Sequence, residues 1–386
     1  MRRYLLSDEE EAVRQAVHTL VVREIAPLSA LSDRQELFPR RQLELLGAHG
    51  YLGMIVAPEF GGAGASYLAQ TLVIEALAEV DAAAAVVYEV HNALAVEAIW
   101  RFGTPEQKRA WLPDMCQGKR IGAFALTEAD AGSHAAALTA RAEQVDGGYR
   151  LRGRKMFITG GGEADWYLVF ATLDPAKKAE GITAFWVPKG AKGLTFGPPL
   201  EKMGIRAART SEMVLDDVLV PASHRVGEEG QGYAIALYLL DGGRIGIAAQ
   251  AVGIMAAALA RARRYARERR QFGQPIGHFE GVQWRLADMA TDLEAARLLT
   301  YEAARHREEG PQQRPLFAMA KLFASEHAMR HALDAVQIFG GYGYMAEYGI
   351  ERLARDAKVT EIYEGTSEIL RWIIASHLLK DWYDTP

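Results

Sequence analysis

The sequence has very little cysteine and no strong excess of charge. Cys116 is the one cysteine among 386 residues, which excludes a disulfide within the chain and a cysteine-rich metal site. It also fits a reducing compartment, weakly. The 44 lysines and arginines nearly balance the 49 aspartates and glutamates, giving a formal net charge of −5. This charge gives no reason to expect nucleic acid or an anionic membrane as a partner.

Long apolar stretches are also missing. The most apolar run, IGIAAQAVGIMAAALA at residues 245–260, holds a glutamine and is shorter than the roughly 20 residues that cross a bilayer. The opening residues, MRRYLLSDEEEAV, place acids directly after a very short apolar piece, unlike a signal peptide. We therefore expect no membrane span and a cytoplasmic location.

Several catalytic signatures are absent as well. The sequence has no P-loop, no GxSxG and no HExxH. GYGYMA at 341–346 matches GxGxxA by letter, but it follows a helical pattern rather than a strand, so a nicotinamide-type dinucleotide site is not expected. His327 and His331 are four residues apart without a third ligand, which favours a solvated or interhelical pair over a metal site.

The pattern along the chain changes twice, which divides it into three predicted domains. Residues 1–118 have helical periodicity, residues 119–228 alternate like short strands, and residues 229–386 contain four long helical segments with short links. We predict an α+β multidomain fold: an N-terminal helical domain, a small middle β-barrel or sandwich domain, and a C-terminal antiparallel four-helix bundle.

Two helix starts carry clear capping signals. Ser7 and Glu10 have the spacing of a capping box, and apolar residues then recur on one helical face. In GTPEQKRAWL, Thr104 is placed as N-cap, Pro105 in the first turn and Gln107 to reach back. A single long helix is predicted over 233–270, with an arginine-rich C-terminal end that suits the helix dipole.

Three short segments are open to more than one interpretation when each is taken alone. AFALTEADAGS at 123–133 is equally a plain domain-entry loop or a loop that presents N–H groups and hydroxyls to a ligand. KMFITGGG at 155–162 is more often core and turn than a cofactor wall. Glu364, in VTEIYEGTSEILRW, is by itself more often an exposed acid at the start of a helix than a buried base.

Taken together and in order, the segments FALTEADAGS, KMFITG, LDGGRIGIAAQAVG, RERRQFGQPI and QIFGGYGYMAEYGIERLARDAKVTEIYEGTSEI change that balance. The chain resembles the acyl-CoA dehydrogenase family, and it is most similar to the short-chain, butyryl-type branch. The resemblance covers essentially the whole chain. It implies a flavoenzyme whose FAD lies between the β domain and the bundle.

The resemblance also implies which residues contact the cofactor. Phe124, Leu126 and Thr127 would line the isoalloxazine, and Phe157, Ile158 and Thr159 would cover another side. Gly132 and Ser133 would lie at the phosphates, with Ser133 also near the pantetheine arm. Residues that the family uses for the neighbouring subunit's FAD are Arg269, Phe272, Gln337, Gly340 and Gly341, while Thr366 and Glu368 also touch cofactor. The active unit would then be at least a dimer, and the family habit is a homotetramer.

The reaction implied is α,β-dehydrogenation of an acyl-CoA thioester to the trans-2-enoyl-CoA. Glu364 matches the base that takes the α-proton, and apolar contact would raise its pKa toward the operating range. Some branches place the base on the first bundle helix, where this chain has Gly243. Asp241, Arg244 and Gly365 match substrate contacts. The family passes its electrons to electron-transfer flavoprotein.

Four positions depart from the family pattern. Ala129 replaces a proline, His134 an aspartate, Gly160 an asparagine and Glu280 a glutamine that touches the pyrophosphate. An acid at 280 would repel phosphate, so that role is not transferred to Glu280. The base and the flavin segments remain.

Two alternatives stay open at this stage. One is a flavin oxidase or monooxygenase on the same fold, which would make hydrogen peroxide as substrate is consumed. The other is a helical interaction protein without catalysis, which would not take up FAD. Acyl chain length and branching are not predicted.

Overall fold

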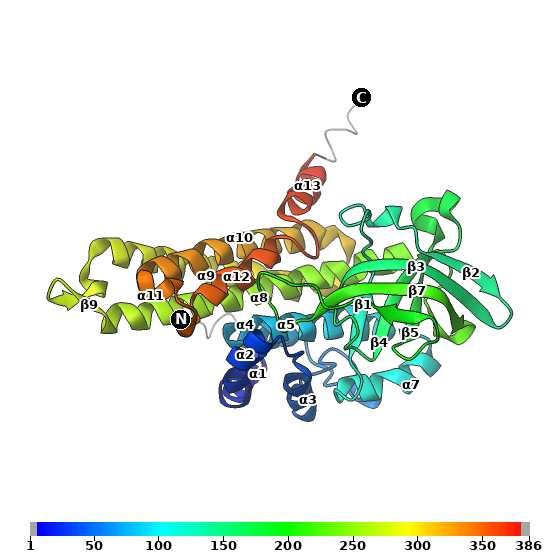
Figure 1. The fold of residues 1–386 in the computed structure, drawn as a ribbon, viewed down its shortest axis with the longest axis horizontal. Helices are drawn as coiled ribbons and strands as arrows, with labels where there is room; N and C mark the ends of the chain where they lie inside the picture. The colour runs from blue at the N-terminus through cyan, green and yellow to red at the C-terminus, as the bar shows by residue number, and fades with distance from the viewer. Residues whose placement is uncertain (1–5, 380–386) are drawn as a thin grey trace.

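The computed structural model describes residues 6–379 and has three successive parts along the chain (Figure 1). The first part is helical, and both capping boxes predicted from the sequence are confirmed, at Ser7 with Glu10 and at Thr104 with Gln107. Its helices are α1 (Asp8–Leu20), α2 (Ala26–Gln35), α3 (Arg40–Ala48), α4 (Tyr67–Val80), α5 (Ala82–Glu89), α6 (Glu97–Phe102) and α7 (Pro105–Cys116).

The second part is a single sheet of eight strands in the order β6-β7-β3-β2-β4-β5-β8, with β1 pairing in parallel with β4. Between residues 119 and 227 the only helical pieces are short 3-10 turns, as the alternating sequence predicts. The strands are β1 (Gly122–Ala125), β2 (Arg141–Val145), β3 (Gly148–Thr159), β4 (Trp166–Thr172), β5 (Ile182–Pro188), β6 (Leu194–Phe196), β7 (Thr210–Pro221) and β8 (Arg225–Val226).

The third part is built on the predicted long helix, α8 (Gly232–Glu268), together with α9 (Glu280–Arg305) and α10 (Arg314–Phe339). A small hairpin of β9 (Arg270–Gln271) and β10 (Gln274–Pro275) joins α8 to α9. Three further helices follow α10: α11 (Gly341–Tyr344), α12 (Glu351–Lys358) and α13 (Ser367–Leu378). The fourth long helix, α13, packs chiefly on α10 and projects away from the other helices (Figure 1).

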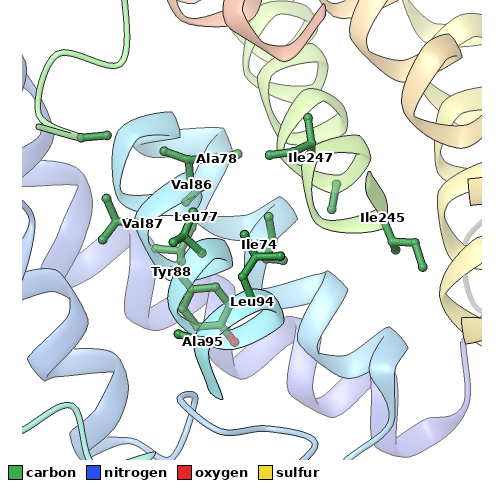
Figure 2. Close-up of a cluster of buried hydrophobic side chains, with 14 of the residues drawn as sticks. Ile74, Leu77, Ala78, Val86, Val87, Tyr88, Leu94, Ala95, Ile245 and Ile247 are labelled. Carbon is green, nitrogen blue, oxygen red and sulfur yellow. The ribbon is translucent and has the colours of Figure 1, made fainter. Parts of the chain in front are cut away.

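The core joins the first and third parts. Figure 2 shows apolar side chains of α4 and α5 beside Ile245 and Ile247 of α8. Small residues let these helices approach closely: a Cβ added at Gly253 of α8 would lie 2.4 Å from the Glu75 carbonyl oxygen of α4. Two helical stretches, Ala82–Phe102 and Gly232–Glu268, are long and apolar enough to cross a membrane by length and composition alone. However, 100% and 78% of their most apolar 18-residue windows are buried inside the protein.

Helix α12, which the sequence analysis did not separate from its flanking motif, fastens all three parts together. Arg352 lies 3.1 Å from Asp356 and 3.3 Å from Asp81, and it donates to the Ser29 hydroxyl at 2.8 Å. Asp356 in turn accepts from the backbone N–H of Ile205, in the loop between β6 and β7. One ion network therefore holds the β part and the N-terminal helices against the segment that leads to residue 364.

We predict that Arg352→Met destabilises the whole protein, because it leaves the buried carboxylates of Asp81 and Asp356 without their cation. Breaking one side of a buried pair costs roughly 3–5 kcal/mol. The thermal midpoint measured by circular dichroism should fall clearly. Arg330→Met is the control, since Arg330 is exposed and lies 3.8–4.0 Å from its partners Asp292 and Asp288, so its loss should change the midpoint little. Equal midpoints for the two variants would contradict the role given to this network.

Candidate active site

The segment between α12 and α13 makes a strained turn that presents one carboxylate. Glu364 has a φ of +53° and Gly365 a φ of +106°. A positive φ is uncommon for a residue other than glycine, and such strain concentrates at functional sites. Thr366 ends the turn as the N-cap of α13, accepting from the Ile369 N–H. Lys321 of α10 anchors the turn, because its buried ammonium donates to the Gly365 carbonyl at 2.7 Å.

The Glu364 carboxyl is shielded from solvent on one side, and two cations, Lys321 and Arg244, lie near it. Its Oε2 atom is buried and has no hydrogen-bond donor among the described residues. Burial raises the pKa of this carboxyl to about 7, while the neighbouring Glu89 carboxyl and the charges of Lys321 and Arg244 hold it down. A carboxyl in this range changes protonation near neutral pH, as a general base requires.

Helix α8 supplies the wall opposite this turn. A Cβ built at Gly243 would lie 1.7 Å from Glu364 Oε2, so glycine at this position makes the space that the carboxylate occupies. The next residue, Arg244, is buried and bonds Asp241 at 2.7 Å, and Asp241 also accepts from Arg314 at 2.7 Å. The Arg244 Nε atom is left without an acceptor among the described residues. Asp241, Arg244, Glu364 and Gly365 therefore share one site.

A second set of predicted residues meets in the β part. The Met156 N–H on β3 donates to the Thr127 carbonyl at 2.8 Å, which places FALTEADAGS beside KMFITG. Phe124 packs on Phe170, and Leu126 and Ile158 are buried. Phe157 has a φ of +59° and is 60% exposed, an unusual position for a large apolar side chain. Thr127 and Thr159 are half-buried, and Gly132 and Ser133 lie exposed on the loop that follows.

A buried ion pair fastens this second set together. Lys155 on β3 is fully buried, and its ammonium donates to Glu128 at 2.8 Å and to the Leu126 carbonyl at 3.1 Å. Burial lowers the pKa of Lys155 to about 8, and Glu128 opposes that shift. Glu128 also accepts from the Thr139 and Ala140 N–H groups, which fixes the loop at its far end. Lys155 therefore anchors the loop at the residues on either side of Thr127.

A third set lies at the other end of the bundle. Arg269, Gly340 and Gly341 line a cavity of about 410 Å³, and the Arg269 guanidinium lies 5.2 Å from the centre of the Tyr342 ring. Gly340 has a φ of +61°, and neither glycine has another group within 4 Å of where its Cβ would be, so this wall of the cavity is bare backbone. Phe272 is 91% exposed on the β9–β10 hairpin, and Gln337 is exposed at the end of α10. GYGYMA belongs to this set rather than to a strand–helix junction.

The second and third sets are far apart in one chain. The sheet forms one end of the molecule, and β9 with α11 forms the other (Figure 1). Thr366 and Glu368 lie at the start of α13, next to Glu364. His331, paired in sequence with His327, donates from Nε2 to the Asp292 carboxylate of α9 at 2.9 Å, which makes it an interhelical contact.

Four buried side chains at these sites were missed by the sequence analysis: Glu89, Lys155, Gln250 and Lys321. Gln250 of α8 accepts from the Tyr363 hydroxyl and donates to the Ala82 carbonyl at 2.7 Å, which braces the residue before Glu364. A signal did exist for Lys155, because it falls on the apolar face of an alternating strand. For Glu89 and Lys321 the signal was a single charge inside an otherwise apolar helical pattern.

Comparison with known proteins identifies relatives over nearly the full chain. Profiles of the acyl-CoA dehydrogenase N-terminal, middle and C-terminal domains match residues 7–119, 123–218 and 230–379. A short-chain specific acyl-CoA dehydrogenase of Clostridium acetobutylicum is 42% identical over 97% of this chain and 99% of its own.

Solved structures give the same result. Butyryl-CoA dehydrogenase of Megasphaera elsdenii has a TM-score of 0.94 and 42% identity, covering 97% of this chain and 99% of that one. A chain from the structure of the electron transferring flavoprotein of Acidaminococcus fermentans has a TM-score of 0.95 and 41% identity, with the same coverage.

The raised pKa of Glu364 predicts a pH-dependent gain in stability from Glu364→Gln. The folded protein keeps this proton up to about pH 7, whereas the ordinary value is 4.5, so folding stability falls as pH rises through that interval. Glutamine does not titrate, so Glu364→Gln removes this loss of folding stability at high pH. We expect Glu364→Gln to raise the melting temperature more at pH 8 than at pH 5.

Glu368→Gln, four residues later, is the matched control with the opposite sign. Hydrogen bonds from its own backbone N–H and from the Thr366 hydroxyl lower the pKa of Glu368. The contribution of Glu368 to folding stability is present above its ordinary pKa and is lost as pH falls through its lower pKa in the folded protein. Glu368→Gln should therefore be slightly less stable at pH 8. If the melting temperatures of the two variants change with pH in the same way, the assignment of a raised pKa to Glu364 is refuted.

Proposed function

The chain belongs to the acyl-CoA dehydrogenase family, and from this premise we propose that Glu364 is the base that removes the α-proton of the acyl-CoA thioester. The protein is an oxidoreductase that dehydrogenates acyl-CoA between the α and β carbons. The observation that carries the assignment is the strained turn that holds a buried, donor-free carboxylate oxygen with a pKa of about 7.

The residues around Glu364 support each part of the proton-transfer step. Burial keeps bulk water from the carboxylate, so it accepts a proton more readily than an exposed acid would. A positioned general base contributes on the order of 10²–10⁴ in rate. The Glu364 N–H has no acceptor among the described residues, which leaves it available to the thioester oxygen, where negative charge develops. The buried Arg244, whose Nε lacks an acceptor, sits beside it.

We propose that FAD is the cofactor, and the donor sets present are suited to it. The Arg269 guanidinium at an open, glycine-lined cavity suits a pyrophosphate or the adenine end of a dinucleotide. The exposed Phe157, next to Thr127 across the paired backbone, suits one face of a flavin ring. When bound, the flavin accepts the β-hydride. The residues of the chain hold it, exclude water and move the proton.

We further propose that each FAD is held by two copies of the chain. The Thr127–Phe157 region and the Arg269–Gly340 region lie at opposite ends of one molecule (Figure 1). Residues of both regions match cofactor contacts, so the second region would serve the FAD of a neighbour. The unit would be at least a dimer, and a homotetramer is the expected assembly. A cytoplasmic location stays a prediction.

Electron-transfer flavoprotein is the proposed electron acceptor. The support is the 41% identity to a chain in the structure of the electron transferring flavoprotein of Acidaminococcus fermentans. A supply of that flavoprotein should reoxidise the reduced enzyme, whereas molecular oxygen should do so slowly. Hydrogen peroxide formed in proportion to substrate consumed would instead identify a flavin oxidase.

Glu364→Gln should lose at least a hundredfold in turnover while it keeps its yellow colour and binds acyl-CoA, because only the proton acceptor is removed. The measurement is a dye-coupled assay over straight and branched acyl-CoAs, with flavin content and ligand titration on the same samples. Glu361→Gln is the control, since this acid pairs with Lys358 on the surface and should keep near-normal rates. Near-normal turnover by Glu364→Gln would remove that residue from the mechanism.

Arg269→Gln should lower the FAD retained on purification. Arg270→Gln should not, because the Arg270 guanidinium donates to the nearby Gly273 carbonyl at 2.9 Å and does not line the cavity. A shared site also predicts complementation. Co-expressed Glu364→Gln and Arg269→Gln chains should form mixed dimers with one intact site, built from the Glu364 of one chain and the Arg269 of the other. Activity of the mixture should exceed that of either variant alone. A mixture as inactive as its parts would contradict sharing.

A further inference from the structure

A second carboxyl lies against Glu364 and has no cation of its own. Glu89, the last residue of α5, is completely buried, and neither of its oxygens accepts from an N–H or hydroxyl of any described residue. The carboxyls that act on Glu89 are those of Glu364 and of Glu97 on α6, and both raise the pKa of Glu89. The hydroxyls of Tyr67 and Tyr363 are also near Glu89, but no cation among the described residues acts on it. A buried carboxylate without a cation is costly unless it is protonated.

Two glycines of α8 make room for the two carboxyls side by side. A Cβ at Gly243 would lie 1.7 Å from Glu364 Oε2, and a Cβ at Gly246 would lie 2.4 Å from Glu89 Cγ. Residues three apart in a helix lie on the same face. The pair is therefore packed against one glycine-lined stripe of α8.

The neighbours of the pair decide where its charge resides. Glu364 is close to two cations, Lys321 of α10 and Arg244 of α8, and is preceded by the half-buried Tyr363. Glu89 is close to Glu97 and Glu364, which are both acids. Two carboxyls in contact do not both ionise readily, so the one that ionises first is the one beside the cations.

We propose that Glu89 carries a proton and donates it in a hydrogen bond to the Glu364 carboxylate, so that the two carboxyls hold a single proton between them before substrate binds. Glu89 is then a positioning residue for the base. Its O–H satisfies one oxygen of Glu364 and stabilises the ionised form in a dry site. This inference rests on the proposed function, because it concerns the base of that reaction.

The proton balance of the step follows directly. As the α C–H bond of the substrate breaks, its proton forms an O–H bond on Glu364, and the electron pair stays with the substrate. Glu89 keeps its own proton throughout. The pair thus passes from one negative charge to none, and the α-proton is later released from Glu364 when the pair regains its resting state. Burial and the contact with Glu364 both raise the pKa of Glu89, which is the direction the proposal requires.

Glu89→Gln and Glu89→Leu separate a hydrogen-bond donor from a spacer of similar size. The glutamine amide still donates to Glu364, so the acid limb of the pH profile for flavin reduction by acyl-CoA should stay within about half a pH unit of the wild type. Leucine cannot donate, so that limb should move to higher pH by about one to two units. A shift in the pH profile is not expected from a residue that only fills space.

The protonation of Glu89 is tested without turnover by infrared spectroscopy of the ligand-free holoenzyme at pH 8. The band of a protonated carboxyl should be present in the wild type and in Glu364→Gln, and absent in Glu89→Gln. If Glu89→Leu does not fold, this measurement decides alone. An unchanged acid limb in Glu89→Leu, or a band that survives in Glu89→Gln, would overturn the proposal.

The two levels of the account can fail separately. If Glu364→Gln is inactive and Glu89→Leu leaves the pH profile unchanged, the proposed base stands and only the shared proton is refuted. If Glu364→Gln retains full turnover, the proposed function fails at its base, whatever the infrared band shows.

Discussion

The central constraint of this protein is that the Glu364 carboxyl must be shielded from water and still be able to ionise. Burial alone would keep Glu364 protonated, and full exposure would make it a weak base. The structure balances the two with buried cations, Lys321 and Arg244, at the edge of the same site, and the pKa of Glu364 stands at about 7 as a result. Lys321 also has a pKa lowered by burial to about 7, so the balance is local and depends on exact placement.

That placement is a property of the whole fold. Lys321 donates to the Gly365 carbonyl of the turn at Glu364, and the glycines of α8 pack against the Glu364 side chain. The Tyr363 hydroxyl donates to Gln250, which in turn donates to the Ala82 carbonyl at the start of α5. Helix α12, just upstream, is anchored through Arg352 and Asp356 to the N-terminal helices and to the β part. A disturbance at any of the three domain contacts would therefore reach the base.

The sequence predicted the parts of this account that depend on local chemistry. Capping boxes, the uninterrupted pattern of α8 and the alternation of β3 follow from short-range rules, and the structure confirms them. The candidate site came from the order of several motifs, because Glu364 alone resembles an ordinary helix-start acid.

What the sequence could not supply are pairs formed across long separations. The contact between Glu89 and Glu364, and the bond from Lys321 to the Gly365 carbonyl, join helices that no local pattern relates. Gly243 shows the same limit. From the sequence it was only a position unable to act as a base, whereas the structure shows that its missing Cβ is the space in which the base sits. The departure of α13 from the other bundle helices likewise depends on tertiary packing.

The most direct test of the central claim isolates proton removal from hydride transfer. An acyl-CoA analogue with sulfur at the β position has no hydride to give, so any exchange of its α-hydrogens with deuterium from solvent reports the base alone. The wild-type holoenzyme should catalyse that exchange, and Glu364→Gln should exchange no faster than buffer. Exchange by Glu364→Gln at the wild-type rate would show that another group takes the α-proton.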